Sequence, residues 1–139
     1  MKNVLVTGGA GYIGSHIIEQ LIKKGLKVFI IDNLSTGHKR LLNKRAKFFK
    51  LNINQYKKVN ELIKKYNIDS LIHLAAKLSV SEGEKKPKLY YRNNVKGTSN
   101  LLKAIKNTKV KNFIFSSTCA VYSDKLPYVN ESSKTNPKS

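Results

Sequence analysis

Three glycines near the N-terminus have the clearest chemical potential in this sequence. Gly8, Gly11 and Gly14 are spaced three residues apart, between a short apolar run and an amphipathic stretch. Glycines at a strand-to-helix turn let the backbone approach a pyrophosphate, and the N–H groups and positive dipole end of the helix stabilise its charge. The spacing therefore predicts a dinucleotide-binding turn, and a tight turn without a ligand is the alternative.

Asp32 is the second residue with an evident role. It ends an apolar run at 28–31 and follows Gly14 by 18 residues. A carboxylate there accepts hydrogen bonds from the adenosine ribose hydroxyls and repels a 2′-phosphate, which favours NAD over NADP. Two alternatives stay open: Asp32 only caps the next turn, or Lys39 and Arg40 accommodate a 2′-phosphate.

The hydrophobic pattern predicts the elements that position these residues. Short apolar runs without polar alternation predict strands at 4–6, 28–31, 47–51, 70–74 and 112–116. Amphipathic stretches predict helices at 13–24, 39–43, 56–66 and 88–107, and the polar segment 124–139 is predicted to be a loop. This alternation indicates an α/β fold whose parallel sheet is covered on both faces. With the glycine turn, we expect a doubly wound sheet of Rossmann type, with five strands in the order 3-2-1-4-5. We expect residues 1–139 to form one NAD-binding domain.

Composition narrows the class of protein. The chain has no stretch of about 18 apolar residues, so no membrane span is expected. The single Cys119 offers neither a disulfide framework nor a metal cluster, which favours the cytoplasm. The net charge of +19 comes from 27 basic residues, of which only three are Arg. Because specific nucleic-acid readers depend on Arg, we expect no specific nucleic-acid partner, although weak polyanion binding at low salt is expected.

Several further segments match one family in the same order along the chain. They are Gly11-Tyr12-Ile13-Gly14-Ser15-His16, Asp32-Asn33-Leu34-Ser35-Thr36-Gly37-His38, His73-Leu74-Ala75-Ala76, Tyr90-Tyr91-x-Asn93-Asn94-Val95-x-Gly97-Thr98 and Phe113-Ile114-Phe115-Ser116-Ser117-Thr118. With these segments and its glycine spacing, the chain resembles the extended short-chain dehydrogenase/reductase family over residues 2–139, and in particular its NAD-dependent sugar-nucleotide epimerases and dehydratases.

The resemblance implies where NAD binds. Tyr12 and Ile13 would lie against the pyrophosphate, Asp32 and Asn33 would hold the adenosine ribose, and Asn94 would meet the nicotinamide end. The cofactor-binding residues that the motifs and the resemblance imply are Gly8, Gly11, Tyr12, Ile13, Gly14, Asp32, Asn33, Leu34, Ser35, Thr36, Gly37, Asn52, Ile53, Leu74, Ala75, Ala76, Lys77 and Asn94.

Three of these positions need comment. Asn52 and Ile53 would flank the adenine, and Asn52 stands where the family usually has Asp. Leu74–Lys77 would border the phosphates and nicotinamide ribose, but Lys77 lies one place from where some members carry Lys, so a surface lysine is the alternative. His73 ends a buried strand and is predicted to be a hydrogen-bonded core residue rather than a base.

Thr118 is the catalytic candidate. In the resembled enzymes a Ser or Thr at this position hydrogen-bonds the sugar 4-hydroxyl and a catalytic tyrosine. Dehydratases of the family carry an acidic residue just after it, whereas Cys119 and Ala120 follow here. The resemblance therefore implies an enzyme that interconverts UDP-glucose and UDP-galactose through a 4-keto sugar, with no metal. Another sugar-nucleotide epimerase or dehydratase and a non-catalytic NAD-binding module are the alternatives.

The tyrosine base of the family belongs to a Tyr-x-x-x-Lys pair, in which the ammonium lowers the tyrosine pKa. None of the seven tyrosines in this sequence has a Lys four residues later. The resemblance implies that the pair and the sugar-nucleotide region would follow Ser139, so that residues 1–139 would be an incomplete NAD-binding Rossmann domain, truncated after the fifth strand. We therefore expect the chain alone to be inactive, and the full-length enzyme to bind a UDP-sugar and to form a homodimer.

Overall fold

The fold is a five-stranded sheet whose strands all run parallel. The computed structural model describes residues 2–122 and 128–137. The strands are β1 (Asn3–Thr7), β2 (Lys27–Asp32), β3 (Lys47–Lys50), β4 (Ser70–His73) and β5 (Asn112–Phe115). Their order is β3-β2-β1-β4-β5, and each neighbouring pair is parallel. The predicted α/β class, strand positions and strand order are confirmed.

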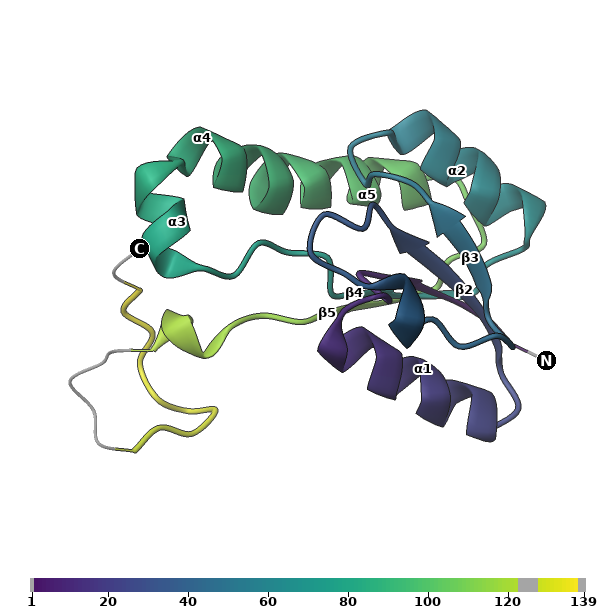
Figure 1. Ribbon diagram of the computed structural model, residues 1–139, viewed down its shortest axis with the longest axis horizontal. Coiled ribbons are helices and arrows are strands. Elements are labelled where there is room, and N and C mark those ends of the chain that lie inside the picture. Colours follow the sequence, from purple (N-terminus) through teal and green to yellow (C-terminus); the bar gives the residue numbers. More distant parts are fainter. Residues whose placement is uncertain (1, 123–127, 138–139) are drawn as a thin grey trace.

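Helices cover both faces of this sheet (Figure 1). The longer ones are α1 (Tyr12–Lys23), α2 (Tyr56–Lys65) and α5 (Gly97–Ile105). Side chains that alternate along the strands divide the core in two. One cluster lies between the sheet and α2 and α5, and includes Leu5, Ile31, Leu71, Ile63 and Leu101. The other lies between the sheet and α1, and includes Val6, Ile30, Ile72, Ile18 and Ile22.

The predicted helix at 88–107 is a helical run with an irregular centre. It begins as α4 (Pro87–Tyr90), continues as a π-helical segment η2 (Tyr91–Lys96) and ends as α5. A π-helical turn adds a residue to the normal turn and is common at functional sites. A short helix α3 (Val80–Lys85) precedes the run and was not predicted.

The remaining elements are short. The helix predicted at 39–43 is a 3-10 turn, η1 (Lys39–Leu41), and a second one, η3 (Cys119–Val121), follows β5. Tyr122 and Thr135 form an isolated antiparallel bridge, so the described part of the predicted loop folds back on the segment after β5. Within the described ranges, none of the helices has the length and apolar character needed to cross a bilayer.

The topology places the functional segments together. In a parallel sheet the carboxyl ends of all strands lie at one edge, and the crevice where strand order reverses is where such sheets bind ligands. Here the order reverses at β1, which lies between β2 and β4. The glycine turn after β1, Asp32 at the end of β2, the segment after β4 and Thr118 after β5 all lie at this edge.

Candidate functional site

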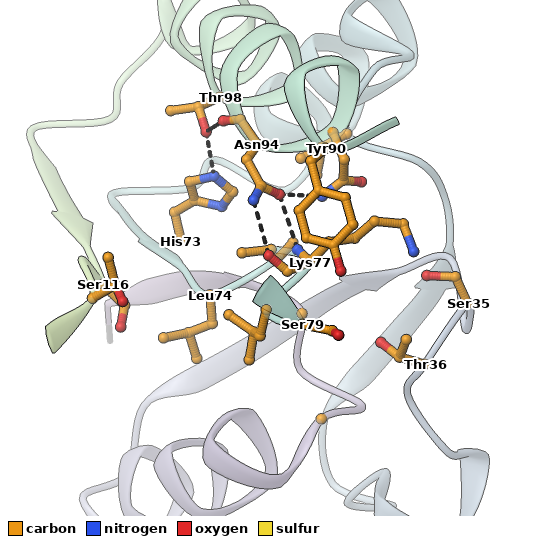
Figure 2. A pocket seen from close by; sticks show the side chains of 18 of the residues that line it. Ser35, Thr36, His73, Leu74, Lys77, Ser79, Tyr90, Asn94, Thr98 and Ser116 are labelled. Atoms are coloured by element: carbon orange, nitrogen blue, oxygen red, sulfur yellow. Dashed lines mark hydrogen bonds between the residues drawn. The ribbon is translucent and has the colours of Figure 1, made fainter. Parts of the chain in front are cut away.

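A large cavity lies at the carboxyl edge of the sheet (Figure 2). Its volume is about 1010 Å3, at the upper end of the range of about 300–1,000 Å3 for small-molecule and cofactor sites. The turns after β1 and β2, the loops after β4 and β5 and the helical run 87–98 form its lining. Among the described residues that line it, Lys77 is the one Lys or Arg, and Asp32 and Glu84 are the acids.

The glycine turn is packed too closely for side chains. Gly8 has a φ of +75°, and a Cβ there would lie 2.8 Å from the Leu74 carbonyl carbon and the Ala75 amide nitrogen. A Cβ on Gly14 would collide with the Gly8 carbonyl oxygen. This packing brings the turn after β1 against the loop after β4, and α1 against the same turn.

The N-terminus of α1 can bind an anion. Gly11 is its N-cap and supplies no side-chain hydrogen bond. The first N–H groups of an α-helix have no partner within the helix, and the helix dipole adds positive potential there. Tyr12 and Ile13 are 76% and 57% exposed and line the cavity beside these groups. The cavity therefore presents backbone donors suited to a phosphate.

Asp32 is the buried carboxylate of the site. One oxygen accepts a hydrogen bond from the Ala10 N–H at 3.0 Å, and the other accepts from the Leu34 N–H at 2.8 Å. A carboxylate offers about four acceptor positions, so each oxygen can accept one more hydrogen bond from a ligand. The bond to Leu34 accompanies a φ of +60° at that residue, a strained conformation for a bulky side chain. Asp32 thus both shapes the turn after β2 and faces the cavity.

The structure brings together most of the predicted site residues. All of the predicted cofactor-binding residues except Leu34 and Asn52 line the cavity, and so does Thr118. The Asn52 side chain instead accepts hydrogen bonds from the backbone and side-chain nitrogens of Asn54. Ile53 is 5% exposed and lines the cavity together with Leu51, which the sequence did not single out.

Asn94 holds the loop after β4 in place. Its side-chain oxygen accepts from the Lys77 N–H, and its side-chain nitrogen donates to the Lys77 carbonyl, both at 2.9 Å (Figure 2). Asn93 donates to the same Asn94 oxygen at 2.9 Å. Asn94 therefore contacts the cavity wall through the main chain of Lys77, a partner that the sequence did not reveal.

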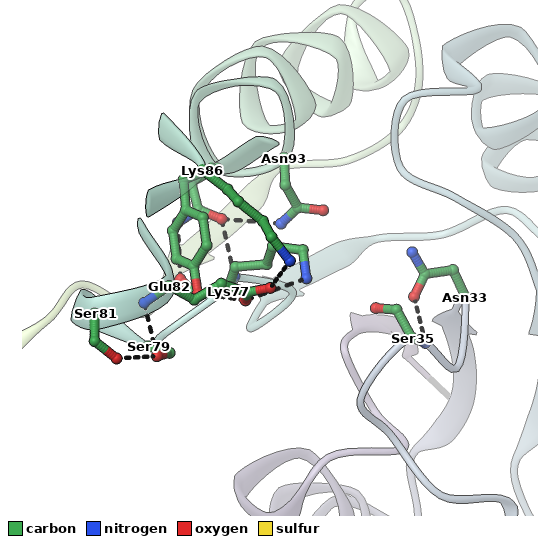
Figure 3. A network of polar contacts seen from close by, with 10 residues as sticks. Asn33, Ser35, Lys77, Ser79, Ser81, Glu82, Lys86 and Asn93 are labelled. Atoms are coloured by element: carbon green, nitrogen blue, oxygen red, sulfur yellow. Dashed lines mark hydrogen bonds and ion pairs between the residues drawn. The ribbon is translucent and has the colours of Figure 1, made fainter. Parts of the chain in front are cut away.

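A polar cluster around Glu82 borders the cavity (Figure 3). Glu82 accepts a hydrogen bond from the Tyr90 hydroxyl at 2.9 Å and pairs with Lys86 at 3.4 Å and Lys77 at 4.0 Å. The Tyr90 hydrogen bond, followed by the lysine charges, lowers the pKa of Glu82, while burial and the same hydrogen bond raise the pKa of Tyr90. The sequence analysis missed this cluster, although Glu82 and Lys86 have helical i,i+4 spacing.

Thr118 lies at the end of the cavity formed by the segment after β5. Its side-chain oxygen accepts from the Ala120 N–H at 3.1 Å and caps η3. Its hydroxyl hydrogen can still be donated to a ligand. Within the described ranges, no group of three or more His, Cys, Asp or Glu side chains is arranged to hold a metal ion.

His73 lies beneath this cavity at the end of β4. It is 3% exposed, and its two ring nitrogens lie 2.7 Å from the Thr7 hydroxyl and 2.9 Å from the Thr98 hydroxyl. The prediction of a hydrogen-bonded core histidine is confirmed. Burial lowers its pKa from 6.5 to about 4, so the ring is neutral at pH 7.

The pKa of His73 predicts how stability depends on pH. In the unfolded chain the ring takes up a proton below pH 6.5, whereas in the folded chain it does so near pH 4. The free energy of unfolding therefore has its full value above pH 6.5, where the ring is neutral in both states. It falls by about 3 kcal/mol as the pH is lowered to about 4, because only the unfolded chain takes up the proton in this range. Denaturant unfolding between pH 7.5 and 4 should show this slope in wild type and a flatter one in His73→Asn. Parallel pH profiles for the two proteins would contradict this prediction.

Known proteins resemble this chain in sequence and in structure. It is 43% identical over 136 residues to a UDP-glucose 4-epimerase of Lactobacillus helveticus, and 44% identical over 135 residues to one of Klebsiella pneumoniae. These matches cover 96% and 91% of this chain, and 41% and 97% of those proteins. The UDP-glucose 4-epimerase from Brucella ovis, solved in complex with NAD, is similar with a TM-score of 0.92 and 40% identity.

These matches also show how much of a relative this chain represents. The match with the Brucella ovis structure includes 99% of this chain but only 42% of that protein. It likewise spans 45% of the Thermus thermophilus UDP-glucose 4-epimerase complex with NAD, with a TM-score of 0.91 and 36% identity. The chain thus spans about two fifths of the length of these structures.

The family follows from the match along the chain. Residues 4–139 match the NAD dependent epimerase/dehydratase family. This range contains the glycine turn, Asp32, the loop after β4 and Thr118, all of which lie at one cavity. The chain belongs to the NAD dependent epimerase/dehydratase family.

Proposed function

We propose that this chain binds NAD in the cavity at the carboxyl edge of the sheet. The observation that carries the proposal is the pairing, in one cavity, of the N-terminus of α1 with the Asp32 carboxylate. The α1 amides, beside Gly8, Gly11, Tyr12, Ile13 and Gly14, bind the pyrophosphate. Because Gly8 and Gly14 have no Cβ, the turn after β1 packs tightly on the loop after β4 and on α1, which places these amides at the edge of the cavity.

The adenosine end of the cofactor lies at the turn after β2. Asp32 accepts from the ribose hydroxyls with the acceptor positions that Ala10 and Leu34 leave free. Asn33, Ser35, Thr36 and Gly37 line the same part of the cavity, and Leu34 supports it through its backbone. Ile53 and Leu51 form the apolar wall for the adenine, while Asn52 shapes the turn before α2.

The nicotinamide end lies between the loops that follow β4 and β5. Leu74, Ala75, Ala76 and Lys77 border the nicotinamide ribose, and Asn94 keeps this loop in register. Bound NAD supplies a hydride acceptor that can oxidise a sugar carbon and later return the hydride. Thr118 donates its hydroxyl hydrogen toward a sugar oxygen bound beside it.

We further propose that the chain is the NAD-binding part of a UDP-glucose 4-epimerase. The full-length enzyme interconverts UDP-glucose and UDP-galactose, forms a homodimer and works in the cytoplasm. The relatives with NAD in their names support this function, and so does the absence of an acidic residue at positions 119 and 120. A dehydratase needs such a residue beside Thr118 for water elimination, so an epimerase is favoured over it.

Replacing Asp32 tests the cofactor assignment. Asp32→Ala should weaken NAD binding by about 1–3 kcal/mol, since it removes hydrogen bonds to a charged acceptor. The variant should also prefer NAD over NADP by a smaller affinity ratio than wild type, because the repulsion of a 2′-phosphate is lost. Calorimetric titration of both proteins with both cofactors measures these effects.

A second aspartate provides the control. Asp69 accepts a hydrogen bond from the Asn3 N–H at 2.8 Å and lies outside the cavity lining. Asp69→Ala should therefore lower stability without changing the preference between cofactors. Equal affinity of wild type for NAD and NADP would refute the role of Asp32.

A second prediction concerns turnover by the chain itself. A polypeptide limited to these 139 residues should not interconvert UDP-glucose and UDP-galactose above background, because the Thr118 hydroxyl is too weak a base to accept the sugar proton at neutral pH. A coupled assay on protein from a host without its own epimerase measures this. Turnover that disappears in Thr118→Val would show that another residue of this chain is the base.

A further inference from the structure

A line of hydrogen bonds joins the central strand to the cavity wall through His73. Figure 2 shows the part from His73 through Thr98 and Asn94 to Lys77. It begins at the Thr7 hydroxyl on β1, passes through both nitrogens of His73 to the Thr98 hydroxyl, and reaches the Asn94 carbonyl, where Thr98 donates at 2.6 Å. The Asn94 side chain then binds the main chain of Lys77. Buried polar networks of this kind hold a structure in one arrangement when every member has its partner.

The directions of these hydrogen bonds follow from one another. The Thr98 hydroxyl has one hydrogen, which it donates to the Asn94 carbonyl, so it accepts from His73 Nε2. His73 Nε2 therefore carries the proton of the neutral ring, and Nδ1 is an acceptor for the Thr7 hydroxyl. In the opposite tautomer, the Thr98 hydroxyl would have to turn away from Asn94 to donate to the ring.

These hydrogen bonds meet the helical run at the junction between η2 and α5. Thr98 and Asn94 flank the junction between the π-helical segment η2 and α5, and an i,i+4 hydrogen bond links them. Asn94 points to Lys77 from this segment, while Thr98 points to His73 (Figure 2). The hydrogen bond from His73 thus ties the irregular turn to the end of β4.

We propose that Thr7 and His73 are positioning residues for the nucleotide: Thr7 fixes His73 as the Nε2–H tautomer, and His73 holds Thr98 and Asn94 so that the loop 74–77 keeps the shape that binds NAD. This inference rests on the proposed function. Thr7 is fully buried and lies outside the cavity lining, so its hydroxyl cannot contact a ligand there and instead bonds His73.

The first test uses the protein without a cofactor. The Lys77 N–H donates to the Asn94 side chain, so its hydrogen exchange reports whether the loop is held. Thr7→Val removes the donor to Nδ1 and should speed exchange at Lys77 about five- to tenfold, the consequence of weakening one hydrogen bond. Thr98→Val should do the same. Nitrogen NMR of the His73 ring should show the proton on Nε2 in wild type and a changed tautomer population in Thr7→Val.

The second test measures NAD affinity in the same variants. Thr7→Val and Thr98→Val should each weaken NAD binding about five- to tenfold. Thr7→Ser keeps the hydroxyl, so its NAD affinity and its rate of hydrogen exchange at Lys77 should both match those of wild type. The matched control is Thr108→Val, since Thr108 also donates to a main-chain carbonyl at 2.6 Å, that of Ile105, but is not part of this line. It should leave NAD affinity unchanged.

The outcomes separate this inference from the proposed function. If wild type does not bind NAD, the proposed function fails, and exchange at Lys77 still decides whether Thr7 holds the loop. Wild-type exchange and affinity in Thr7→Val would overturn the inference, as would a His73 proton on Nδ1 or an equal loss of affinity in Thr108→Val. If Thr7→Val does not fold, the inference is tested by exchange and NAD affinity in Thr98→Val and by the His73 tautomer in wild type.

Discussion

The site depends on the close approach of two backbone turns, one after β1 and one after β4. At Gly8 the turn has a φ of +75° and leaves no room for a Cβ against Leu74 and Ala75. Because the strands are parallel neighbours, both turns lie at the same edge of the sheet. The N-terminus of α1 and the loop 74–77 can therefore contact one ligand. A side chain at Gly8 would push these two turns apart, and one at Gly14 would push α1 away from the turn after β1.

Polar groups within this edge are held by the fold and also face the cavity. Asp32 accepts from two backbone N–H groups and keeps acceptor positions free. Asn94 uses its side chain to hold the Lys77 main chain, and His73 links the helical run to β1. Each of these residues thus shapes a wall of the cavity through hydrogen bonds to the backbone or to a buried hydroxyl. The high positive charge of the chain plays little part in this, since Lys77 is the one basic residue among the described residues that line the cavity.

Local patterns in the sequence were sufficient for the strands and the glycine turn, and the strand order followed from the fold type that they indicate. Apolar runs identify buried strands, and glycines between a strand and a helix identify the turn, because both depend on neighbouring residues. The tertiary contacts were not predictable in this way. The bonds from Asn94 to Lys77 and the cluster around Glu82 join residues from separate elements. Leu34 was predicted to bind the cofactor from its place in a motif and Asn52 from the family resemblance, but their orientation follows from bonds to Asp32 and Asn54. Their roles, like those of the other cofactor-binding residues and Thr118, stay predictions.

A crystal structure of the chain grown with NAD tests the central claim most directly. We expect the pyrophosphate on the first-turn N–H groups of α1, the adenosine ribose hydroxyls on Asp32 and the nicotinamide ribose beside Leu74–Lys77. The Gly8 turn and the Asn94 side chain should keep their contacts with this loop. Density for NAD at another surface, or a pyrophosphate away from the α1 N-terminus while NAD saturates the protein in solution, would contradict the claim.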